Sequence, residues 1–397
     1  MKRILIVSHA MELGGAERSL LGLLESIDYT RYSVDLFLLR HCGELLSLIP
    51  PQVRLLEEKK AYAALAVPVS QALCRGRLGV VLGRAAGKML ARRYIARHGI
   101  GTENEVELEY SHKYTCALMP PIGEGEYDLA VSFLTPHYFV AQKVRAAVKI
   151  AWIHTDYRSI EMDVPSQRKM WGQYERIVSI SPSVGEAFCA RFPELRERLL
   201  EMENILPEEL VRRGAQQDVS AEMPDDGSIR LLSVGRYSHA KNFDHVPEIC
   251  SLLRKMGLAV TWYLIGYGDA EPLIRRRIAQ WGMEDHVILL GKRENPYPYM
   301  VRCHLYVQPS RYEGKSVAVR EAQMLGKCVA ITDYATARRQ LQRDVDGVIV
   351  PMDNEGCAAA LAALLRDEEK RKQLEQTCLS RDYSGRGQVE KLCELME

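Results

Sequence analysis

The 397-residue chain lacks several features that mark particular classes of protein. It has no run of 18 apolar residues, so no membrane-spanning helix is expected. Its ten cysteines include no C-x-x-C pair, so neither a zinc site nor a disulfide framework is expected. The formal net charge is only +1, which argues against nucleic acid as the main partner because no overall basic field would attract phosphates. No repeat or low-complexity segment interrupts the sequence.

The chain does have the length and composition of a two-domain globular protein. A chain of 397 residues suits two domains of roughly 200 residues each. Its apolar content of 47% and charged content of 26% are ordinary for such proteins. The N-terminal residues 1–8 have a basic start and a short apolar run without a small-residue cleavage site, which predicts a first strand and no signal peptide. The cysteines are therefore expected to be reduced thiols in a cytoplasmic protein.

Short apolar runs alternate with helical patterns along the whole chain, which predicts α/β domains with parallel sheets. The polar, acidic stretch 216–228 divides this alternation and is predicted to be a linker. The first domain is expected at 1–215, the second at 229–380, and residues 381–397 are expected to return to the first. Strands of the first domain are predicted at 4–8, 32–39, 128–133, 149–153 and 177–180.

The stretch 310–326 carries the strongest functional signal in the chain. Apolar segments at 305–308 and 328–332 flank it, so it reads as strand, loop, helix and strand, with Ser316 positioned to cap the helix and Gly326 to end it. A loop that opens into a helix presents backbone N–H groups and a positive dipole end, which favour phosphate. Glu313 and Glu321 frame this anion site, and carboxylates in such a place suit sugar hydroxyls. The pattern predicts a nucleotide sugar as ligand.

Two cations follow the first strand of the second domain. Arg236 and Lys241 lie in the segment Gly-Arg-Tyr-Ser-His-Ala-Lys-Asn, directly after the strand that starts at residue 229. Arginine offers a planar fork for phosphate oxygens and lysine a mobile point charge. The pair is predicted to neutralise a leaving diphosphate.

These motifs together resemble retaining glycosyltransferases of family 4. The resemblance is carried by Glu313 and Glu321 with seven residues between them, in the setting Pro-Ser-Arg-Tyr-Glu-Gly-Lys-Ser, and by Gly-Arg followed by Lys-Asn. It implies a GT-B architecture, in which two doubly wound Rossmann-like domains face each other across a cleft. The likeness covers nearly the whole chain and is weakest at 50–125, where acceptor recognition is expected to vary.

The resemblance also implies roles for individual residues. Those implied at the reacting centre are the diphosphate clamp Arg236 and Lys241, Glu313 at the transferred sugar, and His154 in the Trp-Ile-His segment at a strand end. Those implied in nucleotide-sugar binding are Glu321 at the ribose, with Gly14, Gly15, Gly266, Arg293, Gly314, Lys315 and Ser316 around the phosphates and base. The Gly14-Gly15 turn lacks the third glycine of a dinucleotide fingerprint, which disfavours a dehydrogenase.

The reaction implied by the resemblance is hexosyl transfer with retention of configuration. The donor is expected to be a UDP-sugar and the acceptor a lipid-linked saccharide in capsule or exopolysaccharide synthesis, without a cofactor or divalent metal. Lys315-Ser316 stands where many family members have Phe-Gly, which leaves the identity of the sugar open.

A basic segment at 74–99 has two competing interpretations. It carries seven Arg and Lys residues and no acid, together with an apolar stripe of Leu78, Val81, Leu82, Ala85, Met89 and Ile95. Such a helix can rest on an anionic membrane surface, which would place the protein peripherally on the inner face of the plasma membrane. The alternative is a helix that packs on the N-terminal domain by its apolar face.

Two other functions remain compatible with the motifs. A nucleotide-sugar epimerase would convert the donor without any acceptor. A non-catalytic module would bind the nucleotide sugar and never turn it over.

Overall fold

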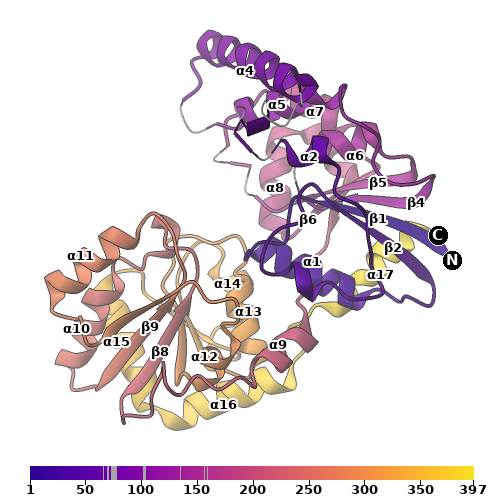
Figure 1. The fold of residues 1–397 in the computed structure, drawn as a ribbon. Helices are drawn as coiled ribbons and strands as arrows, with labels where there is room; N and C mark the ends of the chain where they lie inside the picture. The colour runs from indigo at the N-terminus through magenta and orange to yellow at the C-terminus, as the bar shows by residue number, and fades with distance from the viewer. Residues whose placement is uncertain are drawn as a thin grey trace. The chain divides into compact units, whose positions relative to one another are not determined.

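The computed structural model describes residues 1–65, 67–68, 71–72, 78–101, 104–134, 136–155, 157–158 and 160–397. These residues form two compact units: Met1–Ile205 together with Arg386–Glu397, and Leu206–Gly385. Figure 1 shows a twisted sheet with flanking helices in each unit. Among the helices of the described ranges, none is long and apolar enough to cross a membrane.

The first unit is built on a seven-stranded, all-parallel sheet with the order β3-β2-β1-β4-β5-β6-β7. Its central strands are buried apolar runs, as a sheet covered on both faces requires. The predicted strands are confirmed, each to within a few residues at its ends. The strands are β1 (Lys2–Ser8), β2 (Tyr32–Leu38), β3 (Arg54–Leu55), β4 (Tyr127–Ser132), β5 (Ala146–Ile153), β6 (Arg176–Ser179) and β7 (Leu199–Glu201).

Helices connect these strands by crossovers. They are α1 (Gly15–Ser26), η1 (Leu46–Leu48), α2 (Lys60–Ala63), α4 (Leu78–His98), α5 (Val106–Cys116), α6 (His137–Lys143), α7 (Val164–Trp171), α8 (Pro182–Arg191) and η2 (Pro193–Arg198). The end of the chain, with η4 (Arg386–Gln388) and α17 (Val389–Glu394), also belongs to this unit, where the Lys2 ammonium donates to the Met396 carbonyl.

The second unit repeats the same design with a six-stranded parallel sheet in the order β10-β9-β8-β11-β12-β13. Both sheets therefore have the strand order of the doubly wound Rossmann fold, which places ligands at the carboxyl ends of the strands. The strands are β8 (Ile229–Val234), β9 (Val260–Ile265), β10 (Val287–Gly291), β11 (Leu305–Gln308), β12 (Val329–Thr332) and β13 (Val348–Val350).

Helices cover both faces of this second sheet (Figure 1). One face carries α10 (Val246–Lys255), α11 (Glu271–Trp281) and α15 (Asn354–Arg366), and the other carries α9 (Glu208–Gly214), α12 (Tyr297–Arg302), α13 (Val317–Met324) and α14 (Ala337–Gln340). The remaining helices are η3 (His239–Lys241) and α16 (Glu368–Ser380).

The boundary between the units lies earlier than the predicted linker. The second unit begins at Leu206, and the segment 216–228 is part of it. Val219 and Met223 are buried in the same apolar cluster as Val211 and the helices on that face. Two apolar anchors thus hold a segment whose polar composition suggested a linker.

The basic helix α4 does not pack on the domain through its predicted apolar stripe, and its contact with a membrane stays a prediction. Its buried positions include Gly83, Gly87 and Ala91, and a Cβ added at Gly87 would lie 2.6 Å from the Tyr110 carbonyl oxygen of α5. The two helices therefore approach through small residues. Of the predicted apolar stripe, Leu78, Leu82 and Met89 are exposed instead of packed on the domain. Residues 74–77 of the predicted segment lie outside the described residues.

Candidate active site

The predicted strand, loop and helix around Glu313 are present at the carboxyl end of the second sheet. Strand β11 ends at Gln308, the loop follows, and α13 begins at Val317. Ser316 occupies the N-cap position, although its side chain makes no capping hydrogen bond. Gly326, with a φ of 71°, follows the end of the helix, as the sequence predicts.

Lys241 and Glu313 form an ion pair within the second unit. The Lys241 ammonium lies 2.5 Å from Glu313 Oε1, and the two side chains are 18% and 11% exposed. The Ser310 hydroxyl donates to the same carboxylate oxygen at 2.7 Å. The structure therefore brings together the cation and the acid that the sequence assigned to the reacting centre.

A chain of buried hydrogen bonds orients the Glu313 carboxylate. Tyr306 donates its hydroxyl to Gln308 Oε1 at 2.8 Å, and Gln308 Nε2 donates to the Ser310 hydroxyl at 2.9 Å. Because Ser310 accepts from the Gln308 amide, its own proton is directed at Glu313. Gln308 and Ser310 are fully buried, so this arrangement fixes the carboxylate before any ligand arrives.

A second set of contacts positions Lys241. Arg311 donates to both carboxylate oxygens of Asp244, at 3.1 and 3.0 Å, and to the His239 carbonyl at 2.6 Å. Burial would raise the pKa of Asp244, but the Arg311 guanidinium holds it below its usual range. Asn242, with a φ of 60°, ends η3 in the left-handed region that asparagine tolerates. The loop after β8 is thereby tied to the loop that carries Glu313.

Glycines allow two of these loops to pack closely. A Cβ at Gly266 would lie 1.9 Å from the Gly235 carbonyl oxygen, and one at Gly268 would lie 2.4 Å from the Tyr237 carbonyl oxygen. Their φ angles of 155° and 151° also disfavour side chains. Gly266 is therefore required by the approach of two backbone segments, whether or not it also contacts a nucleotide.

Gly314 has no comparable requirement. It is exposed, its φ is not in the left-handed region, and a Cβ there would meet no atom within 4 Å. Beside it Lys315 is half-buried, and the Ser316 N–H donates to Gln340 Oε1 at 2.6 Å. The Ser316 N–H already has a protein partner, which the sequence did not predict.

The other predicted residues of the second unit differ in their surroundings. Arg236 is exposed and, among the described residues, makes no ion pair, in contrast to Lys241. Glu321 is 2% exposed and accepts a hydrogen bond from the Tyr297 hydroxyl at 2.9 Å. Arg236 is therefore open to a ligand, whereas Glu321 is held by its own domain.

Arg293 forms an ion pair and a hydrogen bond with residues of its own unit. Its guanidinium pairs with Glu222 and donates to the Tyr299 hydroxyl at 3.1 Å, and that hydroxyl donates to Glu222 at 2.8 Å. Hydrogen bonds from Arg293 and Tyr299 lower the pKa of Glu222. Arg293 thus anchors the segment 216–228, and its predicted contact with the nucleotide remains a prediction.

The predicted residues of the first unit lie at the carboxyl ends of its strands. Gly14 and Gly15 form the start of α1 after β1. His154 follows β5, and its Nε2 lies 3.0 Å from the Phe133 carbonyl, so Nε2 carries the proton and Nδ1 is an acceptor. Burial lowers the pKa of His154 to about 4, which keeps the ring neutral. Asp156, from the same motif, lies outside the described residues.

Within the described ranges, no group of three or more His, Cys, Asp or Glu side chains is placed to hold a metal ion.

The sequence did not identify Gln308, Ser310, Arg311 and Asp244 as positioning residues. A signal for the first was present, because Gln308 is a polar residue at the end of the otherwise apolar run Leu-Tyr-Val.

Comparison with known proteins identifies a family that is similar to part of the second unit. Residues 216–378 match the family "Glycosyl transferases group 1". This matched segment lies within the second unit and includes Arg236, Lys241 and both glutamates. The match covers less than half of the chain and shows similarity of this segment to the family.

Two curated relatives are similar over part of their length. The amylovoran biosynthesis glycosyltransferase AmsK of Erwinia amylovora is 32% identical over 145 residues, which cover 34% of this chain and 35% of the relative. A Campylobacter jejuni protein named N-acetylgalactosamine-N,N'-diacetylbacillosaminyl-diphospho-undecaprenol 4-alpha-N-acetylgalactosaminyltransferase is also 32% identical over 145 residues, with 36% and 39% covered. The chain thus spans little more than a third of the length of these relatives.

Solved structures show the fold of the whole chain. HepE of Anabaena, solved in complex with UDP-glucose, superposes with a TM-score of 0.68 at 15% identity and covers 99% of this chain and 100% of its own. TarM of S. aureus, solved with UDP, gives the same TM-score at 12% identity, with 100% of both chains covered. These neighbours and the two parallel sheets confirm the predicted fold class, a GT-B fold of two Rossmann-like domains.

Proposed function

We propose that the protein is a glycosyltransferase that moves a hexose from a nucleotide sugar, bound by the second unit, to an acceptor bound by the first. The observation that carries the proposal is the Lys241–Glu313 pair at the carboxyl end of a Rossmann-type sheet, inside the segment that matches glycosyl transferases group 1. A cation and an acid held together at this edge suit a ligand that joins a phosphate to a sugar.

The chemistry follows from charge. Breaking the bond between sugar and diphosphate develops negative charge on the leaving group, and Lys241 and Arg236 are the cations that stabilise it in the transition state. The exposed Gly314 lets the phosphates approach the loop backbone. Glu313 is already engaged by Lys241 and Ser310, which favours a role in holding the sugar over nucleophilic attack. We therefore propose front-face attack by the acceptor, with retention of configuration.

The relatives guide the choice of donor and acceptor. UDP or UDP-glucose is named with the neighbouring structures of HepE and TarM, so the proposed donor is a UDP-sugar. The names of the curated relatives refer to amylovoran biosynthesis and to a diphospho-undecaprenol acceptor. The proposed acceptor is accordingly a lipid-linked saccharide in the synthesis of a capsule or exopolysaccharide.

An acceptor of this kind would be met at a membrane surface, and α4 supports that location. Leu78, Leu82 and Met89 are 62%, 66% and 50% exposed, and Arg93 and Arg97 of the same helix are also exposed. We propose that this face rests on the anionic inner face of the plasma membrane. Because α4 packs on α5 through small residues, its large apolar side chains are available for this contact.

Co-sedimentation with vesicles tests the membrane contact. The protein should pellet with anionic phosphatidylglycerol vesicles and less with neutral phosphatidylcholine, and Arg93→Glu with Arg97→Glu should abolish the difference. Arg275→Glu with Arg276→Glu, at exposed positions on α11, is the control with the same change in net charge. Equal binding by both variants would refute the assignment to α4.

The proposed activity is tested in two steps. Thermal unfolding with UDP, GDP and ADP should show stabilisation by UDP, since a ligand that binds only the folded state raises the melting temperature. Labelled UDP-sugars and a membrane extract then separate the alternatives. Only a transferase moves label into lipid, an epimerase converts the donor without acceptor, and a binding module leaves the donor unchanged. A protein that no nucleotide stabilises is not an enzyme of this kind.

A further inference from the structure

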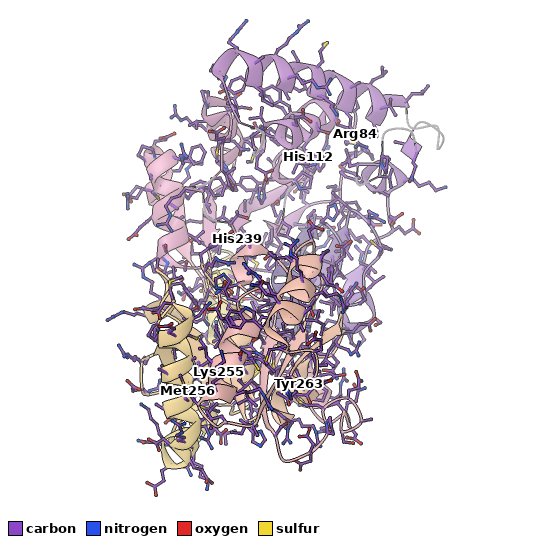
Figure 2. The ribbon with its side chains drawn as sticks, turned by 90° about the vertical axis from the view of Figure 1, so that its left-hand side faces the viewer. Arg84, His112, His239, Lys255, Met256 and Tyr263 are labelled. Atoms are coloured by element: carbon purple, nitrogen blue, oxygen red, sulfur yellow. The ribbon has the colours of Figure 1, made fainter. Side chains whose placement is uncertain are left out.

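The first unit contains a cavity of its own that the proposed donor site does not use. It has a volume of about 190 Å³ and lies at the carboxyl end of β5, between α5, α6 and α7. The described residues that line it and matter to the argument are Glu109, His112, His137, Tyr157, Met162 and Gln167. Figure 2 labels His112 of α5, with Arg84 of α4 in the same unit.

Two side-chain oxygens at this cavity have no hydrogen-bond partner among the residues that the structure describes. Glu109 Oε1 accepts from the Tyr138 hydroxyl at 2.8 Å, but Glu109 Oε2 is buried and unpartnered. Gln167 Oε1, from α7, is also buried and unpartnered. A buried oxygen without a partner is costly, so two of them on the wall of one cavity indicate a ligand that supplies hydrogen-bond donors.

The described residues that line the cavity include acids and no Lys or Arg. Glu109 and Glu105 are its acids. Burial raises the pKa of Glu109, and nearby Asp163 adds to this, although hydrogen bonds from Ser166 and Tyr138 and the charge of Lys113 act in the opposite direction. Burial lowers the pKa values of His112 and His137 to about 3, so both rings are neutral and offer no positive charge. A phosphate or carboxylate would meet these oxygen lone pairs without a Lys or Arg on the described lining to pair with, so the cavity favours a neutral ligand that donates hydrogen bonds.

The remaining wall is apolar and aromatic, with Tyr157 and Met162 among its members. An apolar cavity with a few fixed polar groups is the usual design of a small-molecule site. A volume of about 190 Å³ is somewhat larger than the cavity of about 150 Å³ that admits benzene, so one six-membered ring with substituents fits.

We propose that this cavity binds one hydroxyl-bearing sugar ring of the acceptor saccharide, with Glu109 Oε2 and Gln167 Oε1 as the receptors for two of its hydroxyl protons. The proposal rests on the function proposed above, because it assigns to the first unit the recognition of an acceptor sugar. Glu109 and Gln167 come from separate helices, so the ring would be gripped from two sides.

Ligand-detected NMR on the full chain tests the proposal. The probes are methyl α-D-glucopyranoside, methyl α-D-galactopyranoside and methyl N-acetyl-α-D-glucosaminide, with cyclohexylamine as a ring of similar size that carries an amine in place of hydroxyls. At least one glycoside should bind, and Glu109→Gln should weaken its binding about tenfold. In this variant the Tyr138 hydroxyl would still donate to the amide oxygen, so the amide N–H would face the hydroxyl donor of the ligand. Gln167→Leu, which removes one acceptor at similar volume, should weaken binding by a comparable factor.

Matched controls separate this site from general effects. Glu107→Gln changes an acid of the same helix that faces Lys88 and Arg92 instead of the cavity, and it should leave glycoside binding unchanged. Gln173→Ala, just beyond α7 on an exposed position, is the control for Gln167. Melting temperatures identify a variant that fails to fold. If Glu109→Gln or Gln167→Leu does not fold, glycoside binding by the other variant tests the proposal.

The outcomes distinguish this proposal from the proposed function. Glycoside binding that ignores both cavity variants, no glycoside binding at all, or binding of cyclohexylamine alone each overturns the sugar site. UDP stabilisation measured on the same samples reports on the second unit. If UDP binds and no glycoside does, only the cavity assignment fails; if glycoside binds and no nucleotide does, the transferase proposal fails.

Discussion

Replacement of Lys241 by methionine is the sharpest test of the donor site, because this side chain has two separable roles. In the structure it neutralises Glu313, 2.5 Å away, and in the proposed reaction it also faces the leaving diphosphate. The Lys241 stem lies beside Gly235, where an added Cβ would be only 3.0 Å from Lys241 Cε, and methionine keeps most of this aliphatic stem while the charge is lost.

The two roles predict effects of different size. A unit charge about 4 Å from the charge that develops on the leaving group contributes about 4 kcal/mol at an effective dielectric of 20. That corresponds to about a thousandfold fall in kcat. For stability, loss of one partner of a fully buried ion pair costs about 3–5 kcal/mol, and this partly exposed pair should cost about 1–3 kcal/mol.

A double-mutant cycle distinguishes these contributions. Glu313→Gln added to Lys241→Met removes the uncompensated carboxylate, so the free energy of unfolding should recover most of its loss, whereas kcat should stay at least a thousandfold below the wild type. Urea unfolding and single-turnover transfer are the assays. Lys255→Met, on the exposed part of α10 and labelled in Figure 2, is the control. Recovery of the rate in the double variant would show that Lys241 acts only by neutralising Glu313, and the clamp would be refuted.

Three further predictions follow from the same region. Gly314→Ala should leave the melting temperature unchanged and weaken UDP-sugar binding about tenfold or more, whereas Gly266→Ala should destabilise the fold because its Cβ would overlap the Gly235 carbonyl. Thermal unfolding and donor titration measure these effects, and a destabilised Gly314 variant contradicts the reasoning. Because the pKa of Asp244 is lowered in the folded protein, its ion pair stabilises the fold above the ordinary aspartate pKa of about 3.9, and this stabilisation is lost as the pH falls through the lower folded pKa. Asp244→Asn should therefore reduce the slope of stability against pH in the acid range, and an unchanged slope would contradict this prediction. Transfer should continue in EDTA, since the leaving group is stabilised by side-chain cations, and a loss that Mg²⁺ restores would show that a metal shares this task.

Much of the fold could be predicted from the sequence because parallel strands buried on both faces are continuous apolar runs. The runs at 4–8 and 305–308 are examples, and each became a central strand. The boundary between the units was harder to predict. Val219 and Met223 are isolated apolar residues in a polar stretch, and only the folded structure shows that they reach a core.

For the candidate site, the residue types could be predicted and their partners could not. Lys241 and Glu313 are 72 positions apart, and which cation meets which acid depends on how two loops fold at the sheet edge. Arg236 and Lys241 have similar charge and lie in one motif, yet one is exposed and the other paired. The family resemblance implied that Arg293 contacts the nucleotide, which stays a prediction, and the sequence did not show that Glu222, 71 positions away, is its partner in the fold.

Helix α4 shows why hydrophobic periodicity alone was insufficient. The pattern of large apolar residues identified Leu82 and Met89 as part of a possible packing face. Helix α5 instead packs on the face that carries Gly83 and Gly87, where the absence of side chains lets the two backbones come close. Glycine contributes little to a hydrophobicity pattern, so this face could not be recognised from the sequence. The large side chains are left outside with Arg93 and Arg97, which is the arrangement that a membrane surface favours.

The glycines of the second unit separate what the fold requires from what a ligand requires. Gly266 and Gly268 are explained completely by the backbone atoms that press on them, so their presence says nothing about function. Gly314 has space for a side chain and an ordinary backbone conformation, so neither packing nor strain accounts for it. It adjoins Glu313, whose carboxylate is fixed in advance by Lys241 and Ser310. The open space at Gly314, next to groups held in a fixed geometry, is therefore compatible with the proposed approach of a phosphate to the loop backbone.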